Sequence, residues 1–469
     1  MPHVLISAAH KSSGKTTLTL GLCAALRRRG QVVQPLKKGP DYIDPMWLAR
    51  AAGRECHNLD FHTQREEEIL ATFSRAMSGA DVALIEGNKG LYDGLDLNGS
   101  NSNAALAALL GAPVVLVLDA RGMTRGVAPL ILGHQAFDPG IRIAGVILNK
   151  VGGARHEAKL RAIIEHYTDV KVLGAVHQDT GIAIAERHLG LIPTNESTRA
   201  DEQIRHVADA VARQVDLEQL LALADEASLE PLPAVPPTRG LPRPDVRIGI
   251  ARDSAFGFYY PGDLEALRAA GAELVELNTL RDTRLPRVDG LFIGGGFPET
   301  HMGQLESNDS LRAEIRNAIE DGMPAYAECG GLMYLARTLV WGERRCEMVG
   351  AIPGDVRVHE RPQGRGYARL RETSYAPWRC GGAGSGAVEI NAHEFHYSSL
   401  ENLSGDLRFA YEVLRGTGVN GRNDGIVHKN LLANYVHLRD VDGNHWAWRF
   451  VDFVRRHARA HRINQASST

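Results

Sequence analysis

Residues 9–17 read AHKSSGKTT, and this stretch decides how the first half of the chain is interpreted. The apolar run HVLISA at 3–8 precedes it, and we expect a helix from Thr16 to Arg29 after it. A glycine-containing turn between a strand and a helix is the setting of a phosphate-binding loop, because backbone N–H groups there hold phosphate oxygens. Ala9 stands where such loops usually open with glycine. The stretch therefore predicts a nucleotide site built on a variant loop.

The loop residues have distinct expected roles. The Lys15 side chain is expected to reach the β- and γ-phosphates of ATP, and the Thr16 hydroxyl is expected to hold Mg²⁺. Asn149 and Lys150 end the run GVILNK, where the Asn149 amide either reads the edge of adenine or belongs to a plain strand-end turn; spacing leaves both alternatives open. The other expected nucleotide-binding residues are Ser12, Ser13, Gly14 and Thr17.

Continuous apolar runs alternate with amphipathic stretches in this half of the chain. Such runs are typical of strands buried on both faces, and the alternation predicts a doubly wound α/β fold with a parallel sheet. Ligands of these sheets bind beyond the carboxyl ends of the strands. The runs after the first are DVALIEG at 81–87, APVVLVLDA at 112–120, RIAGVILNKV at 142–151 and VKVLGAV at 170–176.

Acidic residues recur at the predicted strand ends. Glu86 closes the run DVALIE, where a carboxylate that holds a metal ion is expected, and Mg²⁺ between phosphates needs one or two such ligands. By spacing alone, Asp41 in KKGPDYIDP and Asp93 in IEGNKGLYDG fit a functional role and a solvent-facing one equally well. Asp44 and Asp119 are weaker candidates of the same kind.

The composition excludes several functional classes. The chain has 469 residues and a formal net charge of −3, which argues against a surface for the nucleic-acid backbone. No apolar run approaches the ~18 residues of a membrane span, and the amino terminus lacks a basic leader. The five cysteines form no C-x-x-C pair, which favours a reducing cytoplasm. We expect a cytoplasmic protein with small-molecule partners, whose oligomeric state, a homodimer included, is left open.

A proline-rich stretch, EASLEPLPAVPPTRGLPRPD at 226–245, divides the chain. Its six prolines favour extended backbone and predict a semi-rigid linker. An ATP-dependent domain is expected at 1–225 and a second α/β domain at 246–450, followed by a polar tail at 451–469 that frays. Helices of the second domain are expected near 262–270, 309–321 and 331–340.

The run AYAECGGLMYL places Cys329 on a sharp turn between a predicted strand and a predicted helix. This is the pattern of a nucleophile elbow, in which the helix N-terminus favours a thiolate. The N–H of Gly330 is an expected oxyanion donor, and Gly295 or Gly296 in GGGFPE is expected to supply another. An inert buried thiol is the alternative, but the adjacent glycines argue against it. Cys23, Cys56, Cys346 and Cys380 lack these surroundings and are interpreted as structural.

A thiol nucleophile needs a base, and His437 in ANYVHLRD is the expected one. The segment AHEFHYS groups His393, Glu394 and His396, but H-E-x-H on a strand or loop does not match the helical zinc motif. We therefore expect a structural or interdomain role for this segment, with a reserve base as the lesser alternative.

These motifs together resemble the glutamine-dependent amidotransferases of cobalamin biosynthesis, and among them the cobyrinic acid a,c-diamide synthase family. The segments that carry the resemblance occur in order along nearly the whole chain: SSGKTT, KGPDYIDP, EG…GLYDG, RHLGLIP, GGGFPE, YAECGGLMYL and HEFHYS.

The resemblance implies a dethiobiotin-synthetase-like ATP-dependent domain and a class I-type glutaminase domain. Glutamine would supply ammonia, and ATP with Mg²⁺ would phosphorylate the a and c acetate carboxylates of a tetrapyrrole, so that ammonia displaces the phosphate. By the family pattern Cys329 is the nucleophile and His437 its base. Thr16, Asp41 and Glu86 would serve the metal ion, and Asp41, Tyr42 and Asp93 the substrate or phosphoryl transfer.

Some positions depart from the family pattern, namely Lys38, Asn88 and Lys89 beside the expected acceptor pocket. They leave siroheme or (nickel-)sirohydrochlorin open as an alternative acceptor. CTP synthase is a weaker match, because its triad has a glutamate two residues after the histidine, where this chain has Arg439. A partition-type ATPase switch with an inactive amidotransferase domain is a further alternative, which the Cys329–His437 pair argues against.

Overall fold

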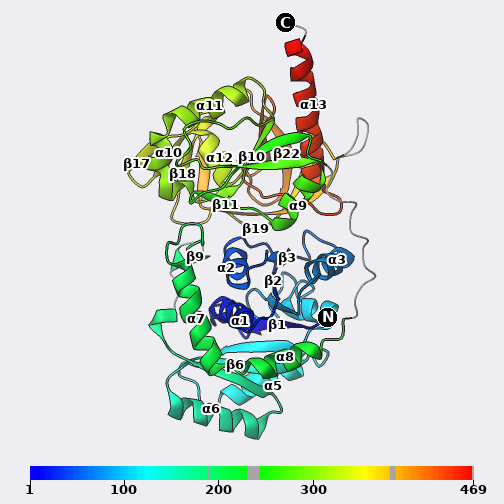
Figure 1. Cartoon of the computed structure of the whole chain (residues 1–469), viewed down its shortest axis with the longest axis vertical. Helices are drawn as coiled ribbons and strands as arrows, with labels where there is room; N and C mark the ends of the chain where they lie inside the picture. The colour runs from blue at the N-terminus through cyan, green and yellow to red at the C-terminus, as the bar shows by residue number, and fades with distance from the viewer. Residues whose placement is uncertain (183, 185, 188–189, 230–242, 381–386, 467–469) are drawn as a thin grey trace. The chain divides into compact units, whose positions relative to one another are not determined.

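The structure of the chain is a computed structural model that describes residues 1–182, 184, 186–187, 190–229, 243–380 and 387–466 (Figure 1). The chain divides into two compact units, Met1–Pro236 and Pro237–Thr469. Residues 230–242 of the predicted linker lie outside the described residues. Among the helices of the described residues, none combines the length and the apolar character that crossing a membrane requires.

A parallel sheet forms the centre of the first unit, which confirms the predicted fold class. Among the described residues its strand order is β3-β2-β4-β1-β5-β6-β7. Each apolar run recognised in the sequence forms one of these strands, because both faces of the sheet are covered and every position favours apolar side chains. The strands are β1 His3–Ala8, β2 Val33–Lys38, β3 His57–Leu59, β4 Val82–Glu86, β5 Val114–Asp119, β6 Ile143–Val151 and β7 Lys171–His177.

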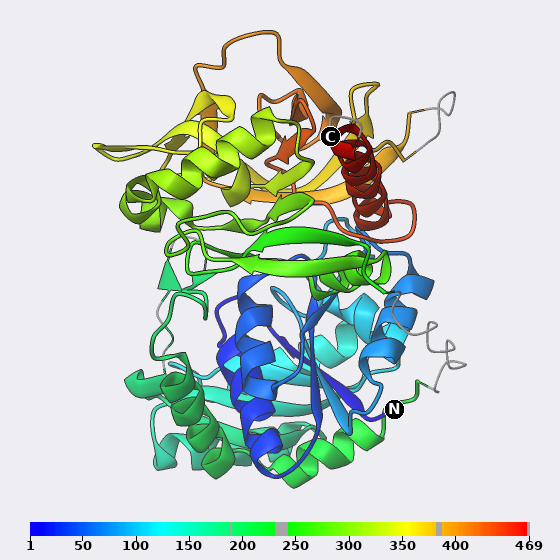
Figure 2. The same cartoon turned by 45° about the horizontal axis from the view of Figure 1, so that its top comes forward.

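Helices cover both faces of this sheet. Side chains of α3, α4, α5 and α6 form one buried cluster with the strands, whereas α1 packs between α2 and α7 on the other face. Both views show α1 and α7 side by side (Figures 1 and 2). The helices are α1 Lys15–Arg28, α2 Ile43–Ala52, α3 Glu66–Ala76, α4 Asn103–Leu110, α5 Val127–Phe137, α6 Ala154–Tyr167, α7 Ala200–Gln214 and α8 Leu217–Asp225. The remaining short elements are η1 Thr180–Ile182, β8 Glu186–Arg187 and β9 Gly190–Leu191.

The second unit is built on a mixed sheet with the order β12-β10-β13-β15-β24-β23-β22-β19-β20. In this order, each strand from β12 to β15 is parallel to the next one along the sheet. The neighbouring strands from β24 onward, β24-β23-β22-β19-β20, pair antiparallel. The strands are β10 Val246–Ala251, β12 Ala272–Leu277, β13 Gly290–Ile293, β15 Ala325–Glu328, β19 Gly364–Glu372, β20 Glu389–His396, β22 Arg408–Arg415, β23 Asn423–His428 and β24 Leu431–Asn434.

Smaller sheets and helices complete this unit. One sheet has the order β17-β16-β18-β21, and β11 pairs with β14. Their bounds are β11 Phe256–Phe258, β14 Gly295–Gly296, β16 Ala336–Trp341, β17 Arg344–Glu347, β18 Ile352–Val358 and β21 Ser398–Glu401. The helices are α9 Pro261–Ala269, η2 Pro298–His301, α10 Met302–Ser307, α11 Asp309–Glu320, α12 Gly330–Leu335 and α13 Trp446–Ala466.

Two sequence-based expectations for the second unit were wrong. The helix expected at 331–340 ends at Leu335, because the next residues form β16, which pairs with β17 and β18. The expected polar tail at 451–469 belongs to α13 as far as Ala466, and Val451 and Val454 are fully buried on that helix. The polar residues beyond Val454 concealed this apolar stripe in the sequence.

Candidate functional site

The phosphate loop connects β1 to α1 and is held by the end of β6. Ser12 and Gly14 take left-handed backbone angles, with φ of 63° and 90°. Asn149 donates from Nδ2 to the Ser13 carbonyl over 2.9 Å, and Lys150 donates from Nζ to the Ser12 carbonyl over 3.1 Å. A Cβ at position 14 would collide with the Asn149 amide, so both the backbone angle and the space there favour glycine. One strand end therefore fixes the shape of the loop.

Both ends of the Asn149 amide contact the protein, since its Oδ1 also accepts the Lys150 N–H over 2.9 Å. These contacts favour a loop-supporting role, and the reading of adenine by Asn149 stays a prediction. Asp119 pairs with Lys150 at 3.0 Å and with Arg121 at 2.7 Å. Burial would raise the pKa of Asp119, but its hydrogen bonds to these cations lower it to about 2. A structural ion pair thus accounts for Asp119.

Lys37, which was not predicted from the sequence, lies at the centre of the acidic cluster. Its Nζ is 2.6 Å from Asp44 Oδ2, 2.9 Å from Glu86 Oε1 and 3.7 Å from Asp41 Oδ2. Thr16 donates to Glu86 Oε1 over 2.6 Å and to Asp44 Oδ2 over 3.3 Å. Lys37 and Glu86 meet because they are register partners on the parallel strands β2 and β4. The structure therefore brings Asp44, the weaker candidate, into direct contact with Thr16.

The cluster keeps charged groups inside the protein. Burial acts to lower the pKa of Lys37, but Asp44, Glu86 and Asp41 hold it well above its usual value. Burial raises the pKa of Glu86. Burial, together with the charge of Asp44, raises that of Asp41 to about 8, whereas Lys37 outweighs burial at Asp44 and lowers its pKa. Three carboxyl groups thus surround one ammonium group.

The residues of this cluster fit a bound Mg²⁺ ion. Glu86 is fully buried, and within the described part of the chain its Oε2 has no hydrogen-bond partner. Among the described residues, no group of three or more His, Cys, Asp and Glu side chains forms a ready-made metal site. Mg²⁺ does not need one, because it usually takes one or two carboxylates and completes its shell with water and phosphate oxygens.

Lys15 contacts the loop that follows β4. Its Nζ donates to the Lys89 carbonyl over 2.5 Å. Burial lowers the pKa of Lys15 to about 8, although the charge of Glu86 acts in the opposite direction. Lys89 itself has a left-handed φ of 39° and an exposed side chain, so its backbone rather than its charge serves this contact.

Asn103, also not predicted, holds this loop in place. It opens α4 and is fully buried. Its Nδ2 donates to the carbonyls of Asn88 and Gly90 and lies 3.1 Å from Ser7 Oγ, and its Oδ1 accepts the Asn88 N–H over 3.1 Å. Asp93 Oδ2 also accepts a hydrogen bond from the Gly90 N–H over 2.8 Å. Asn103 and Asp93 therefore fix from two sides the backbone that Lys15 contacts.

The remaining predicted residues of the first unit lie near the same strand ends. Asp41 Oδ1 accepts the N–H groups of Ile43 and Asp44 and so caps the start of α2, next to the largely buried Tyr42. Lys38 is buried beside the loop after β4, and its Nζ lies 3.3 Å from Asn88 Oδ1. Burial lowers the pKa of Lys38 to about 8.

In the second unit Cys329 sits between β15 and α12 in a strained backbone conformation, with φ of 47° and ψ of −102°. Gly330 and Gly331 follow it, and a Cβ at either position would collide with the backbone at 293–296. At Gly330 the nearest atom is the Gly296 nitrogen, 2.9 Å from the Cβ position. The predicted elbow is present, and the two expected oxyanion-donor segments lie side by side.

His437 follows β24, and its side chain is hydrogen-bonded to that of Cys329. Asp424 fixes the segment before it, accepting the N–H groups of Tyr435 and Val436 over 3.0 and 2.9 Å. The His437 ring is buried, and its Nδ1 lies 3.2 Å from Glu328 Oε2. Burial would lower the pKa of His437, but hydrogen bonds and charge from Cys329 and Glu328 raise it to about 10.

The HEFH segment forms the end of β20 and has a structural role in this unit. Glu394 accepts the N–H groups of Thr417 and Gly418 over 2.6 and 2.9 Å and pairs with His396 at 3.4 Å. His393 stacks on His437 with ring centroids 5.0 Å apart. Glu394 and His396 therefore anchor a loop, whereas His393 supports the ring of the expected base.

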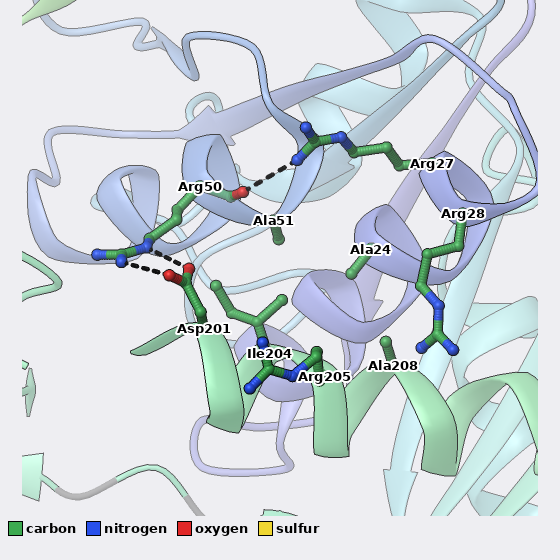
Figure 3. A pocket seen from close by; sticks show the side chains of 9 residues that line it. All are labelled: Ala24, Arg27, Arg28, Arg50, Ala51, Asp201, Ile204, Arg205 and Ala208. Atoms are coloured by element: carbon green, nitrogen blue, oxygen red, sulfur yellow. Dashed lines mark hydrogen bonds and ion pairs between the residues drawn. The ribbon is translucent and has the colours of Figure 1, made fainter. Parts of the chain in front are cut away.

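A cavity of about 370 Å³ on the first unit lies apart from these residues, between α1, α2 and α7 (Figure 3). Arg50 in its wall forms a double hydrogen bond with Asp201, over 2.7 and 2.8 Å. Arg28 pairs with Asp209 at 2.6 Å. Two of the four arginines that line the cavity are thus paired with carboxylates, and the rest of the lining is Ala24, Arg27, Ala51, Ile204, Arg205 and Ala208. We assign the cavity no catalytic role.

Comparisons with known proteins match both units. Residues 5–192 match the family described as CobQ/CobB/MinD/ParA nucleotide binding domain, and residues 247–442 match the CobB/CobQ-like glutamine amidotransferase domain. A Magnetococcus marinus protein named cobyrinate a,c-diamide synthase is 48% identical over 97% of this chain and 97% of its own. Two further proteins of the same name are also similar. The one from Archaeoglobus fulgidus is 42% identical over 96% of this chain and 97% of its own. The one from Methanosarcina acetivorans is 41% identical over 94% of this chain and 93% of its own.

Proposed function

Because this chain belongs to the cobyrinate a,c-diamide synthase family, we propose that it converts the a and c acetate carboxylates of a cobyrinic-acid-type tetrapyrrole into amides, using ATP and glutamine. The family makes the chain a glutamine-dependent ligase with a nucleotide-binding domain. The observation that carries the proposal is that one chain holds both a phosphate loop beside a buried lysine–carboxylate cluster and a thiol–histidine pair on an elbow.

In the glutaminase step, the Cys329 sulfur attacks the glutamine amide carbon and forms a C–S bond. The negative charge on the amide oxygen is stabilised by backbone N–H groups, with those of Gly330 and of Gly295 or Gly296 as the proposed donors. The nitrogen leaves as ammonia when His437 gives it a proton. Water then hydrolyses the thioester, which releases glutamate and restores the thiol.

In the synthetase step, a carboxylate oxygen of the acceptor attacks the γ-phosphorus of ATP and forms an acyl phosphate, with ADP as the leaving group. Ammonia attacks the acyl carbon, phosphate departs, and the amide remains. Lys15 moves from the Lys89 carbonyl to the phosphates, and we propose that Lys37 stabilises negative charge on the transferred group from the side of Asp44 and Glu86.

Mg²⁺, when bound by the Thr16 hydroxyl together with Glu86 and Asp44 or Asp41, would neutralise charge on the phosphates. The protein groups then have separate tasks. Ser12, Ser13, Gly14 and Thr17 present the loop backbone and the start of α1 to the phosphates, and Asn149 fixes the loop. We further propose that Tyr42 and Asp93 border the acceptor, since they lie in the loops after β2 and β4.

An acceptor panel tests the proposed function. Cobyrinic acid, hydrogenobyrinic acid, sirohydrochlorin and siroheme are each incubated with ATP, Mg²⁺ and glutamine, and the products are identified by mass. We expect one and then two hydroxyl-to-amine exchanges on cobyrinic acid. Amidation of a sirohydrochlorin-type acceptor alone would replace the proposed substrate, and no amide on any acceptor would overturn the proposed function.

A further inference from the structure

The thiol–histidine pair needs a third group, because an imidazole that accepts a thiol proton must be held in one orientation and one tautomer. The position two residues after the histidine does not provide a carboxylate. It is Arg439, whose guanidinium lies 5.0 Å from the ring centre of Tyr260. That position therefore supplies no carboxylate to orient the histidine.

Glu328 is placed to be that group. Its Oε2 lies 3.2 Å from His437 Nδ1, and both side chains are only 3% exposed. Since Nδ1 faces Glu328, the other ring nitrogen is the one available to the Cys329 thiol. A carboxylate at Nδ1 favours the tautomer that carries its proton there, which leaves the second nitrogen able to accept the thiol proton.

The Glu328 carboxylate is itself held in place. Its Oε1 accepts the Tyr326 hydroxyl over 2.6 Å and the Leu438 N–H over 2.9 Å. Asn434 donates to the Tyr326 oxygen over 3.1 Å. These contacts join β15 to β24, which are parallel neighbours with Glu328 opposite Asn434. One carboxylate oxygen is thus used for support, and the other is directed to the histidine.

The elbow explains how two consecutive residues reach one imidazole. Successive side chains of a regular strand point to opposite faces of a sheet. Cys329 leaves the strand conformation, with φ of 47° and ψ of −102°, so its side chain does not continue that alternation. Glu328, the last residue of β15, and Cys329 therefore both contact His437.

We propose that Glu328, the residue directly before the nucleophile, is the positioning residue of the glutaminase site and takes the place of a carboxylate after the histidine. The inference rests on the proposed function only in requiring that Cys329 and His437 hydrolyse glutamine. A purely structural role, in which Glu328 only joins β15 to the segment at Leu438, is the alternative that the test must separate.

Other titratable groups near the ring are His393, which stacks on it, and Tyr260, whose hydroxyl lies 3.3 Å from His393 Nδ1. Neither of these contacts places a carboxylate against His437. Glu328 and Cys329 are the groups that raise its pKa against the effect of burial. The electrostatics and the geometry thus identify the same two neighbours.

Glutamine hydrolysis by Glu328→Gln tests the proposal. Gln keeps an acceptor for Tyr326 and Leu438 but removes the charge from Nδ1. We expect kcat to fall by roughly 10²–10⁴-fold with little change in KM, and the pH profile to shift on the limb that reports His437. Ammonium-dependent amidation with ATP should remain at the wild-type level, because the synthetase residues are untouched.

Glu394→Gln is the matched control, since Glu394 is an equally buried carboxylate that pairs with His396 and not with His437. It should keep the wild-type kcat and pH profile. If Glu328→Gln does not fold, Glu328→Asp takes its place: it keeps the charge but withdraws it from Nδ1 by one methylene, and kcat should fall at least about tenfold.

The outcomes separate the two proposals. A wild-type enzyme that does not hydrolyse glutamine overturns the proposed function. A wild-type enzyme that does, together with a folded Glu328 variant of unchanged kcat and pH profile, overturns only the role of Glu328. Equal losses in the Glu328 and Glu394 variants would also overturn it, because the effect would then be structural.

Discussion

The two units each bury a cation among anions, but the balance of charge differs. In the first unit Lys37 faces three carboxyl groups, and Glu86 Oε2 has no hydrogen-bond partner among the residues that the structure describes. In the second, His437 faces one thiol and one carboxylate, and both Glu328 oxygens have protein partners. The first cluster therefore has a carboxylate oxygen that could bind a metal ion, whereas both carboxylate oxygens of the second cluster are already bonded to protein groups. ATP and Mg²⁺ should therefore govern one site and not the other.

The sharpest separation of the two sites is Cys329→Ser. Glutamine-dependent amidation should fall by at least about 10⁴-fold, because the nucleophile is lost and a serine hydroxyl is poorly activated here. Amidation with ammonium chloride and ATP should persist. The reciprocal control is Lys15→Ala, which should abolish amidation with either nitrogen donor and leave glutamine hydrolysis intact. Loss of both reactions in either variant would contradict the independence of the two sites.

Lys37→Met should have the next largest effect. It removes the cation from the buried Glu86 and from the partly exposed Asp41 and Asp44, and breaking the buried ion pair with Glu86 costs about 3–5 kcal/mol of unfolding free energy. Chemical denaturation would measure the loss. We expect Mg²⁺ to restore more stability to this variant than to the wild type, because the metal ion can take the place of the missing charge. Equal effects of Mg²⁺ on both proteins would argue against a metal ion in this cluster.

Asn103→Ala should have a smaller effect. Its removal leaves the Asn88 N–H and two loop carbonyls without their partner, which costs about 1–3 kcal/mol per buried group left unsatisfied. The loop that meets Lys15 should loosen and the KM for ATP should rise. Asn58→Ala is a useful comparison, because Asn58 holds the loop after β2 through bonds to Gly39 and Asp41. If the KM for ATP stayed unchanged in Asn103→Ala but not in Asn58→Ala, the role of Asn103 would be contradicted.

The smallest expected effect is a change in the pKa of His437. NMR of the His437 ring should show it protonated well above the ordinary histidine range, with a pKa near 10. Cys329→Ala should lower that pKa, since the thiol raises it through a hydrogen bond and its charge. Addition of ATP and Mg²⁺ should not move it. A pKa that responds to the nucleotide would break the distinction between the two clusters.

The phosphate loop and the elbow could be predicted from the sequence because their signals lie in consecutive residues. A strand, a glycine turn and a helix in succession around AHKSSGKTT indicate the phosphate loop, and the same succession around Cys329 indicates the elbow. Predicted strand ends indicated Asp41 and Glu86 for the same reason. The two wrong expectations concern segments whose local signal was weak: Ala336–Trp341, which forms β16, and the apolar stripe of α13.

Lys37, Asn103 and Glu328 were missed because their roles depend on contacts between segments distant in the chain. Lys37 meets Glu86 through the register of β2 with β4, and Asn103, at the start of α4, contacts Ser7 in β1. Glu328 was visible in AYAEC, but alternation along a strand would direct it away from the site of its neighbour. Only the backbone turn at Cys329 brings both side chains to His437.

The sequence by itself determined the α/β class and predicted the two chemistries and candidate residues for each, because strand–turn–helix motifs consist of consecutive residues. The tertiary structure decided how the charges are balanced: which lysine sits among the carboxylates, and which carboxylate faces the histidine. Electrostatic energy depends on distances of a few ångströms between groups on different strands, and these distances are fixed by sheet register and packing rather than by spacing along the chain.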